Sequence, residues 1–496
     1  MGSNVSLEEM LVGLESERSL EKPLSEKRLL LFFAAVAILM SIFLLRSGYL
    51  QIVKGKELAQ KAILNHLQIE RLPAARGYIL DRNFVYLAEN VADAEDRLWR
   101  RYSGEESTGQ VLGYVDFSGQ AQSGLELFYD RFLKGKDGER RAEKNSRGEA
   151  EKIVDIQDPQ IGNSLVLHLD LDLQKKIYQL LPEDRAGAVV VIDINSGGIL
   201  ALVSKPGFNS NLFSGDLDEA LYYKLEQNPL KPFFNRAISG QYPPGSIFKL
   251  IIGSGALEEK LIDPYEIKDV PNRLTIVNPY NPDIVYVFPD WKDQGKIDFF
   301  AALKESSNVY FYKTGEALGW NNLYKYAQLF GLGGILGIDL TGEARGYIPQ
   351  SGWLGDLYHA AIGQGEVKVT VLQMAMATAA LANGGKLYQP QLVDKIIDEG
   401  DNLVKDILPQ IIKSGFLQTD TVQLMKKGME TGSGIYGKTG TAQFNADKNK
   451  YHSWFTSFSR NIAITVLVEE GGRGSTAAKP IALEIYQYIK ELKKLN

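Results

Sequence analysis

The sequence predicts an α+β fold, in which one antiparallel sheet covered by helices stands on a small elongated module behind a single apolar helix. Between residues 165 and 496, β-rich runs lie at both ends of a long helical stretch, so strands from both ends are expected to meet in one sheet. Residues 46–164 mix short strands, turns and a charged run from Lys134 to Lys152, which indicates a smaller module. Leu29–Leu45 contains no charged residue and is long enough to suit a membrane span.

The strand-like runs of the large domain are rich in β-branched residues and end in turn residues. The first two, Ala188–Asp193 and Ile199–Ser204, are joined by the hairpin signal Asn195-Ser196-Gly197-Gly198. A helical middle is predicted from about Leu217 to Leu424. The remaining predicted elements are an edge strand around Lys438, strands at His452–Phe458 and Ile462–Val468 that turn at Arg460-Asn461, and a closing helix at Ala477–Leu492.

Four segments follow from this pattern. They are a polar tail at 1–28, a transmembrane signal anchor at 29–45, a pedestal at 46–164 and the large domain at 165–496. No small-residue cleavage site follows the anchor, since Arg46-Ser47-Gly48-Tyr49 is a poor one. Basic residues flank both sides of the anchor, so the charge rule gives no orientation. The alternative for the apolar segment is a buried core helix.

Composition excludes several kinds of chemistry. The 496 residues include no cysteine, which rules out disulfides, thiol catalysis and thiolate metal sites. The four histidines show no metal-ligand spacing, so neither a metal nor a cofactor is predicted. A net charge of −6 gives no argument for nucleic-acid binding.

The first motif that carries chemistry is Ser246-Ile247-Phe248-Lys249. The preceding Tyr242-Pro243-Pro244-Gly245 excludes a helix, so Ser246 is expected in the first turn of a helix that continues to Lys260. Lys249 lies three residues on, on the same face. It could act as the base for the serine hydroxyl if burial or a nearby cation lowers its pKa. The alternative is a chance match, as at Ser19-Leu20-Glu21-Lys22.

The second motif is Ser306-Ser307-Asn308. A serine hydroxyl there could relay a proton, and the asparagine amide could bond the lysine or a substrate peptide. The alternative is an N-cap for the helix predicted at Val309–Ala317, and the two roles are compatible.

Lys-Thr-Gly occurs twice, which forces a choice. Lys313-Thr314-Gly315 falls inside an apparent helix and is interpreted as incidental. Lys438-Thr439-Gly440-Thr441 lies among strand-like runs, where a cation and two hydroxyls could hold a carboxylate. Gly440 would let a substrate backbone approach, and Lys438 would be the cation that lowers the pKa of Lys249. The alternative for Lys438 is an exposed turn lysine.

Together the three motifs supply a nucleophile, a base, a relay and a carboxylate clamp, the set needed for acyl transfer through a serine ester. With them in place, the chain resembles the penicilloyl-serine transferase superfamily and, within it, the class B penicillin-binding proteins. The further segments that carry this resemblance are Arg76-Gly77-Tyr78-Ile79-Leu80-Asp81-Arg82-Asn83, Leu87-Ala88-Glu89-Asn90, Gly124-Leu125-Glu126, Tyr129-Asp130, Leu133-Lys134-Gly135, Leu169-Asp170-Leu171-Asp172-Leu173-Gln174, Asn235-Arg236-Ala237 and Gly363-Gln364-Gly365-Glu366.

Three segments look most like the elongation-type group, penicillin-binding protein 2. They are Val309-Tyr310-Phe311-Tyr312, Gly337-Ile338-Asp339-Leu340-Thr341-Gly342-Glu343 and His452-Ser453-Trp454-Phe455. The resemblance implies a penicillin-binding/β-lactamase-like transpeptidase domain on a dimerisation-type pedestal. It also implies D,D-transpeptidase activity on peptidoglycan stem peptides and covalent inhibition by β-lactams.

The resemblance further implies a role for each motif residue. Ser246 would be acylated, Lys249 would be its base, and Ser306 and Asn308 would line the site. Lys438, Thr439 and Thr441 would bind the terminal carboxylate, with Gly440 between them, and the backbone N–H groups of Ser246 and Thr441 would form the oxyanion hole. The implied location is a single-pass protein of the bacterial inner membrane with its catalytic domain outside the cytoplasm. The implied partner is a polytopic glycan polymerase of the shape, elongation, division and sporulation family.

The sequence departs from the family pattern at three places. Phe84 stands where glycine is usual, and Ser307 stands where aspartate or cysteine is frequent. Only about twenty residues separate Asn90 from Gly113, where the family inserts a much longer head, so a reduced head is predicted.

Other functions remain open at this point. A division-type transpeptidase is the nearest, and a scaffold that activates a glycan polymerase is the non-enzymatic one. A β-lactamase or D,D-carboxypeptidase would need a water-activating group, and no Glu-x-x-x-Asn deacylation motif lies between Ser306 and Lys438. A membrane β-lactam sensor would need several spans, and the sequence predicts one.

Overall fold

The computed structural model describes residues 25–92, 98–144, 150–215, 219–278, 280–444 and 450–495. Most of the predicted tail at 1–28 therefore lies outside the described residues. The chain divides into two units: Met1–Leu72 with Glu139–Asp158, and Pro73–Gly138 with Pro159–Asn496.

The first unit contains the apolar helix and a small sheet. The helix α1 (Glu26–Gly48) continues through a π-helical turn (Tyr49–Val53), with a mean hydropathy of 2.6 in its most apolar window. Within the described chain it is the one helix long and apolar enough to cross a membrane, and it includes the predicted anchor. The helix α2 (Gly55–His66) follows, and β1 (Leu67–Leu72), β5 (Gly138–Lys144) and β6 (Ala150–Gln157) form a sheet in the order β1-β5-β6.

The second unit is built around the predicted antiparallel sheet. Its five strands are arranged in the order β18-β19-β20-β8-β9, and every neighbouring pair is antiparallel. The strands are β8 (Gly187–Asp193), β9 (Ile199–Lys205), β18 (Tyr436–Gln443), β19 (Tyr451–Ser459) and β20 (Ile462–Val468). The strand that carries Lys438 is therefore at the edge, as predicted.

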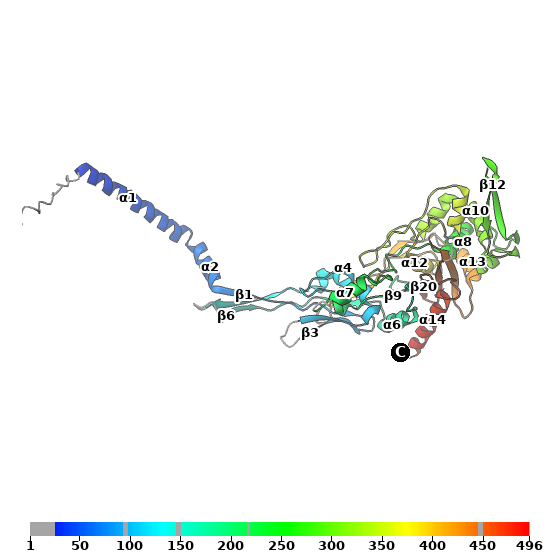
Figure 1. Cartoon of the computed structure of the whole chain (residues 1–496). Helices are drawn as coiled ribbons and strands as arrows, with labels where there is room; N and C mark the ends of the chain where they lie inside the picture. The colour runs from blue at the N-terminus through cyan, green and yellow to red at the C-terminus, as the bar shows by residue number, and fades with distance from the viewer. Residues whose placement is uncertain are drawn as a thin grey trace, which may run out of the picture. The chain divides into compact units, whose positions relative to one another are not determined.

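Helices cover both faces of this sheet. On one face, α6 (Leu171–Leu180) and α14 (Ala478–Leu495) pack on a cluster that includes Val189 and Val191. The alternate residues Ala188, Val190 and Ile192 belong to the larger core on the other face, with α12 (Val371–Ala382) (Figure 1). Because successive strand residues point to opposite faces, burial of both sets shows a sheet enclosed between helices.

The remaining described helices of this unit pack around the larger core, except α7, which has no buried residue. They are α3 (Gly109–Leu112), α4 (Gly124–Phe128), α5 (Asp130–Leu133), α7 (Glu219–Glu226), α8 (Lys249–Glu258), α9 (Phe299–Lys304), α10 (Asn308–Leu329), α11 (Leu354–Ala361) and α13 (Thr419–Met429), with 3₁₀ turns at Glu105–Ser107, Ser210–Leu212 and Gly245–Phe248.

The predicted helical middle is wrong in part, because strands interrupt it. They are β10 (Lys268–Val270), β11 (Arg273–Asn278), β12 (Asn281–Pro289), β13 (Gly295–Ile297), β14 (Leu387–Tyr388), β15 (Val393–Ile397), β16 (Leu403–Asp406) and β17 (Ile411–Lys413). β11 and β12 form a hairpin, with β12 labelled in Figure 1. Along β11, half-buried and exposed residues alternate, which is the period of a strand with one covered face. The alternation covers only six residues, so it gives a weaker sequence signal than the longer apolar runs on either side.

A second sheet joins the pedestal segment to the large domain. It has the order β16-β15-β7-β2-β3-β4, and its further strands are β2 (Ile79–Leu80), β3 (Tyr86–Ala92), β4 (Leu98–Tyr102) and β7 (Ser164–Leu167). The proposed boundary at 164/165 falls within β7, which pairs with β2 on one side and β15 on the other.

The same region contains a buried ion cluster. Glu126 is fully buried and accepts from Arg76 at 2.8 Å and from Arg100 at 2.7 Å, and Arg76 also reaches Asp130 at 2.8 Å. The segment that begins at Arg76 and the segment Gly124-Leu125-Glu126, both part of the family resemblance, are thus joined by an ion pair. In the span predicted to have lost a head, the structure has a hairpin of β3 and β4 followed by short helical turns.

Candidate active site

The nucleophile motif begins in a tight turn rather than in an α-helix. Ser246 is half-buried in the 3₁₀ turn Gly245–Phe248, and the α-helix α8 starts at Lys249. Gly245 has φ +57°, its N–H donates to the Gly363 carbonyl at 2.8 Å, and a Cβ there would lie 2.8 Å from the Thr441 carbonyl oxygen. Only glycine fits this position without strain, and the turn that carries Ser246 is thereby held against β18.

Lys249 is fully buried and bonded to the second motif. Its Nζ donates to the Ser306 carbonyl and to Asn308 Oδ1, both at 2.8 Å, and lies 3.4 Å from Ser306 Oγ. Burial lowers the pKa of Lys249 well below its ordinary value, the charge of Lys438 lowers it further, and Asp290 opposes the shift. A lysine with a lowered pKa is the one that can accept a proton near neutral pH.

Ser306, Ser307 and Asn308 have different roles in the structure. Ser306 has φ +61°, a left-handed conformation that is rare outside glycine, and its carbonyl meets Lys249. Ser307 is the N-cap of α10, because its Oγ accepts from the Tyr310 N–H at 3.1 Å. The capping alternative therefore falls to Ser307, while Ser306 and Asn308 contact the lysine.

Sequence reasoning missed Asp290. Its Oδ2 accepts from Ser307 Oγ at 2.6 Å and from the Val309 N–H at 3.1 Å. The residue directly follows β12, in the region expected to be helical, so no local pattern linked it to Ser307. A carboxylate at position 307 would face Asp290 as a like charge, whereas the hydroxyl of Ser307 donates to it.

The third motif lies on the edge strand beside the nucleophile turn. Lys438 is buried and its Nζ donates to the Thr439 carbonyl at 3.2 Å. Burial lowers the pKa of Lys438 to about 7, and the carboxylate of Glu305 opposes that shift. A Cβ at Gly440 would lie 2.8 Å from the Pro244 carbonyl oxygen, so the close approach seen here is that of the protein's own chain.

The glycine-rich loop after β20 packs on this strand. Thr441 Oγ1 accepts from the Gly474 N–H at 3.2 Å, which leaves the hydroxyl proton available to a ligand. A Cβ at Gly474 would lie 2.4 Å from the Gly440 carbonyl oxygen. Sequence reasoning gave this loop no role, and its signal was only the glycine content of Gly471-Gly472-Arg473-Gly474.

The other Lys-Thr-Gly is part of a helix surface. Lys313 is exposed on α10 and pairs with Glu316 at 2.8 Å, and Thr314 donates to the Tyr310 carbonyl one turn earlier. The structure thus separates the two copies: Lys313 faces solvent, and Lys438 lies buried at the sheet edge near Lys249.

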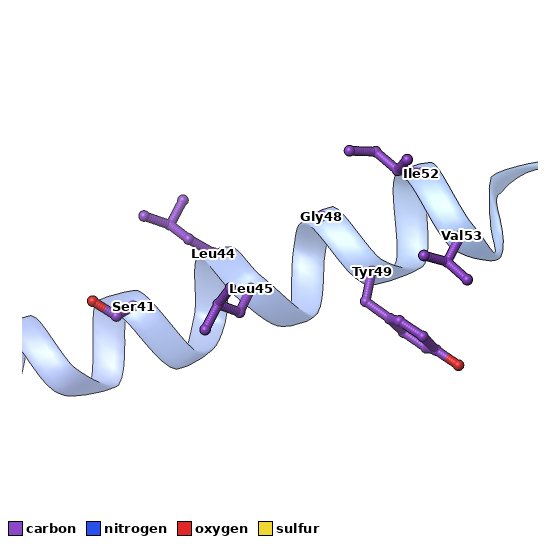
Figure 2. Close-up of a pocket in the computed structure, with 7 residues that line it drawn as sticks. All are labelled: Ser41, Leu44, Leu45, Gly48, Tyr49, Ile52 and Val53. Atoms are coloured by element: carbon purple, nitrogen blue, oxygen red, sulfur yellow. The ribbon is translucent and has the colours of Figure 1, made fainter.

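The structure brings together residues from all three motifs, at the junction of the 3₁₀ turn, α8, α10 and β18. A separate open pocket on the surface of the apolar helix contains none of them; it is lined by Ser41, Leu44, Leu45, Gly48, Tyr49, Ile52 and Val53 (Figure 2). In the part of the chain that the structure describes, no group of three or more His, Asp or Glu residues is placed to hold a metal ion.

Two parts of the chain match models of known protein families. Residues 187–487 match the family described as the penicillin binding protein transpeptidase domain, and residues 92–167 match the penicillin-binding protein dimerisation domain. The chain belongs to the penicillin-binding protein transpeptidase family. The resemblance inferred from the motifs is therefore confirmed.

Curated relatives and solved structures agree with this assignment. The peptidoglycan D,D-transpeptidase MrdA of Haemophilus influenzae is 30% identical over 460 residues, covering 83% of this chain and 69% of the relative. The MrdA of Acinetobacter baumannii is 27% identical over 598 aligned positions, covering 94% and 88%. The crystal structure of Pseudomonas aeruginosa PBP2 in complex with WCK 5153 is 27% identical, with a TM-score of 0.71 over 84% of this chain and 96% of that one. A chain of a peptidoglycan synthase complex is 26% identical, with a TM-score of 0.73 over 93% and 97%.

Proposed function

We propose that this protein is a peptidoglycan D,D-transpeptidase that cross-links stem peptides during cell-wall elongation through an acyl-serine intermediate. The observation that carries the proposal is the buried Lys249, held by Ser306 and Asn308 and next to the charge of Lys438. A buried lysine with a lowered pKa, three residues after a half-buried serine, is suited to activate that serine.

In the first half-reaction, Lys249 takes the proton of Ser246 Oγ while the oxygen attacks the carbonyl of the D-Ala–D-Ala amide. The tetrahedral oxyanion would be bound by the backbone N–H groups of Ser246 and Thr441, whose segments meet at Gly245. The amide C–N bond then breaks, and the proton passes to the leaving D-Ala amine, with the Ser306 hydroxyl within 3.4 Å of Lys249 as a relay.

In the second half-reaction, the amine of a neighbouring stem attacks the ester carbonyl and loses a proton to Lys249. The bond between the acyl carbon and Ser246 Oγ breaks, and that proton returns to Oγ, which frees the serine. Lys438, Thr439 and Thr441 would hold the donor's terminal carboxylate until D-Ala leaves, since a cation and two hydroxyls match its acceptor oxygens. A β-lactam would enter by the same attack on its amide and remain as an ester.

The elongation role and the cellular setting belong to the proposal as well. The MrdA relatives and the synthase-complex chain support an elongation enzyme that acts beside a polytopic glycan polymerase. The apolar helix α1 and its π-helical extension would anchor the protein in the bacterial inner membrane with the catalytic domain outside. The proposed division of the chain is a cytoplasmic tail at 1–28, a transmembrane anchor at 29–45, a pedestal at 46–164 and the transpeptidase domain at 165–496.

The test is a cross-linking assay with donor and acceptor stem peptides on the full chain in detergent. Wild type should release D-Ala and form a cross-linked dimer in equal amounts, and Ser246→Ala should do neither. The matched control is Ser118→Ala, an exposed serine far from the motifs in sequence, which should behave as wild type. D-Ala release without the dimer would point to a carboxypeptidase, and activity in Ser246→Ala would refute the assignment.

A further inference from the structure

Asp290 links the β11–β12 hairpin to the turn that holds Lys249. Its backbone N–H donates to the Asn272 carbonyl at 2.8 Å, which closes the base of the hairpin. Its Oδ1 accepts from the Trp291 N–H at 2.8 Å and from Gln294 Nε2 at 3.3 Å. One oxygen of the carboxylate is therefore held by residues of its own loop, and the other is directed at the start of α10.

The other carboxylate oxygen holds the start of α10. Asp290 Oδ2 accepts from Ser307 Oγ at 2.6 Å and from the Val309 N–H at 3.1 Å, the two residues that flank Asn308. A negative charge at a helix N-terminus also interacts favourably with the helix dipole. Because Asn308 Oδ1 and the Ser306 carbonyl are the acceptors for Lys249, whatever holds this turn also holds the lysine.

The same carboxylate acts on Lys249 through its charge. Lys249 is influenced by Lys438 from β18 and by Asp290 from the segment after β12, and these act in opposite directions. Glu305, which precedes the turn, acts in turn on Lys438 and pairs with Lys292 at 2.7 Å. Asp290 is thus the negative group that offsets the second lysine.

We infer that Asp290 is a positioning residue for the acyl-serine reaction: it fixes the Ser306–Asn308 turn that holds Lys249 and contributes a negative charge that acts on this lysine. The inference rests on the proposed function and deepens it, since it adds a residue outside the three motifs to the machinery that prepares the base.

The test compares the pH dependence of acylation in Asp290→Asn, Asp290→Ala, Asp290→Glu and wild type. The readout is the second-order rate constant for acylation by a fluorescent penicillin, measured on the full chain in detergent between about pH 5.5 and about pH 9.5. Asp283→Asn is the matched control, because Asp283 is exposed on the same hairpin. The folded fraction of each variant is measured by thermal unfolding, and rates are expressed per folded molecule.

Asp290→Ala removes the acceptor for Ser307 and Val309, so acylation is expected to fall about 10- to 100-fold, the range for a misplaced catalytic group. Asp290→Asn keeps an oxygen but loses the charge. The pKa of Lys249 should then fall, and the limb on which the rate rises with pH should move to lower pH. Asp290→Glu should restore that limb towards the wild-type position, and Asp283→Asn should leave rate and profile unchanged.

Two results would overturn the inference while wild type still acylates at Ser246. One is a wild-type rate and profile in both Asp290→Asn and Asp290→Ala. The other is a loss that only follows the folded fraction, with an unshifted limb, which would mean a structural role alone. If Asp290→Ala does not fold, Ser307→Ala breaks the same contact from the other side and should lower the rate. Absence of acylation in wild type would instead refute the proposed function.

Discussion

Two clusters of buried charge in the larger unit are built in opposite ways. Around Glu126, buried charges are paired with opposite charges: Arg76 and Arg100 each form an ion pair with Glu126, at 2.8 Å and 2.7 Å. Around Lys249, the charge of a second buried lysine, Lys438, lowers the pKa of Lys249, and the acceptors bonded to Lys249 Nζ are a carbonyl, an amide and a hydroxyl, all uncharged.

This difference separates a structural cluster from a chemical one. Opposite charges that satisfy one another hold segments together, and removing one partner leaves an uncompensated buried charge. Buried like charges lower stability, but they also shift pKa values, which is what a base for a serine needs. The two clusters should therefore respond to substitution in opposite ways.

The largest expected effect is on Lys249. Lys249→Ala should lower acylation per folded molecule by about 10²- to 10⁴-fold, the range for loss of a general base. The matched control is Lys205→Ala, since Lys205 is also buried but bonds the Tyr178 and Leu181 carbonyls and Glu183. That variant should lose stability and keep its acylation rate per folded molecule. The reverse pattern would end the distinction between the clusters.

The next effect is on the paired cluster. Glu126→Gln should lower the free energy of unfolding by about 3–5 kcal/mol, because two buried guanidinium groups lose the charge of Glu126 and only Arg76 keeps its pair with Asp130. Thermal or urea unfolding of the purified chain measures it. Glu139→Gln removes an exposed pair with Arg141 and should change the free energy of unfolding by less than about 0.5 kcal/mol. Equal stability of the two variants would show that the buried cluster contributes nothing specific.

A third prediction concerns Lys438 and its copy on α10. Lys438→Ala should lower the rate of acylation by a stem-peptide donor about 10- to 100-fold by removing the carboxylate's cation, and Lys313→Ala should leave that rate unchanged. Single-turnover kinetics with donor peptide measure the rate. A loss in Lys313→Ala instead would mean that the wrong Lys-Thr-Gly was chosen.

Because the pKa of Lys438 is lowered by folding, this residue should make the stability of the protein depend on pH. Its folded pKa of about 7 lies below the ordinary 10.5, so the unfolded chain binds the proton more tightly. The buried charge therefore lowers the free energy of unfolding by its full amount below about pH 7, and this loss disappears as the pH rises towards 10.5. Lys438→Met should therefore be more stable than wild type near pH 6, and the difference should shrink at alkaline pH. A difference that does not vary with pH would contradict the buried, shifted lysine.

The smallest expected effect is at Phe84, in the motif that also carries Arg76. Phe84 has φ +62°, which explains why glycine is usual there. Phe84→Gly should be more stable than Phe84→Ala by about 1 kcal/mol, the opposite of the ordinary order, because only glycine adopts this conformation freely. Both variants lose the contact of Lys395 with the ring, so it cancels. Chemical denaturation of the two variants checks the order.

Local patterns predicted much of the fold. The strands β8, β9, β19 and β20 and the closing helix agree with their predicted positions within a few residues, because each is a continuous apolar or amphipathic run. The β11–β12 hairpin was not predicted, because its alternating pattern is short and lies between strongly helical segments. The sheet that joins β7 to β2 and β15 could not be predicted either, since pairing between distant strands leaves no local signal.

The candidate site shows the same limit. Ser246, Lys249, Ser306, Asn308 and Lys438 were found because motifs place the chemistry at short spacing, and the structure brings their segments together. Asp290 and the Gly474 loop were missed, because they meet the motifs only through folding. The left-handed φ of Ser306 was not foreseen, since serine carries no preference for it. The catalytic roles of all these residues stay a prediction until they are measured.

The central claim is that Ser246 forms the covalent intermediate. The most direct measurement is intact-mass spectrometry of wild type and Ser246→Ala after incubation with benzylpenicillin, followed by peptide mapping. The account predicts one stable adduct on wild type, mapped to Ser246 and absent from the variant. An adduct that persists in Ser246→Ala, or a wild-type adduct that maps to another residue, would contradict it.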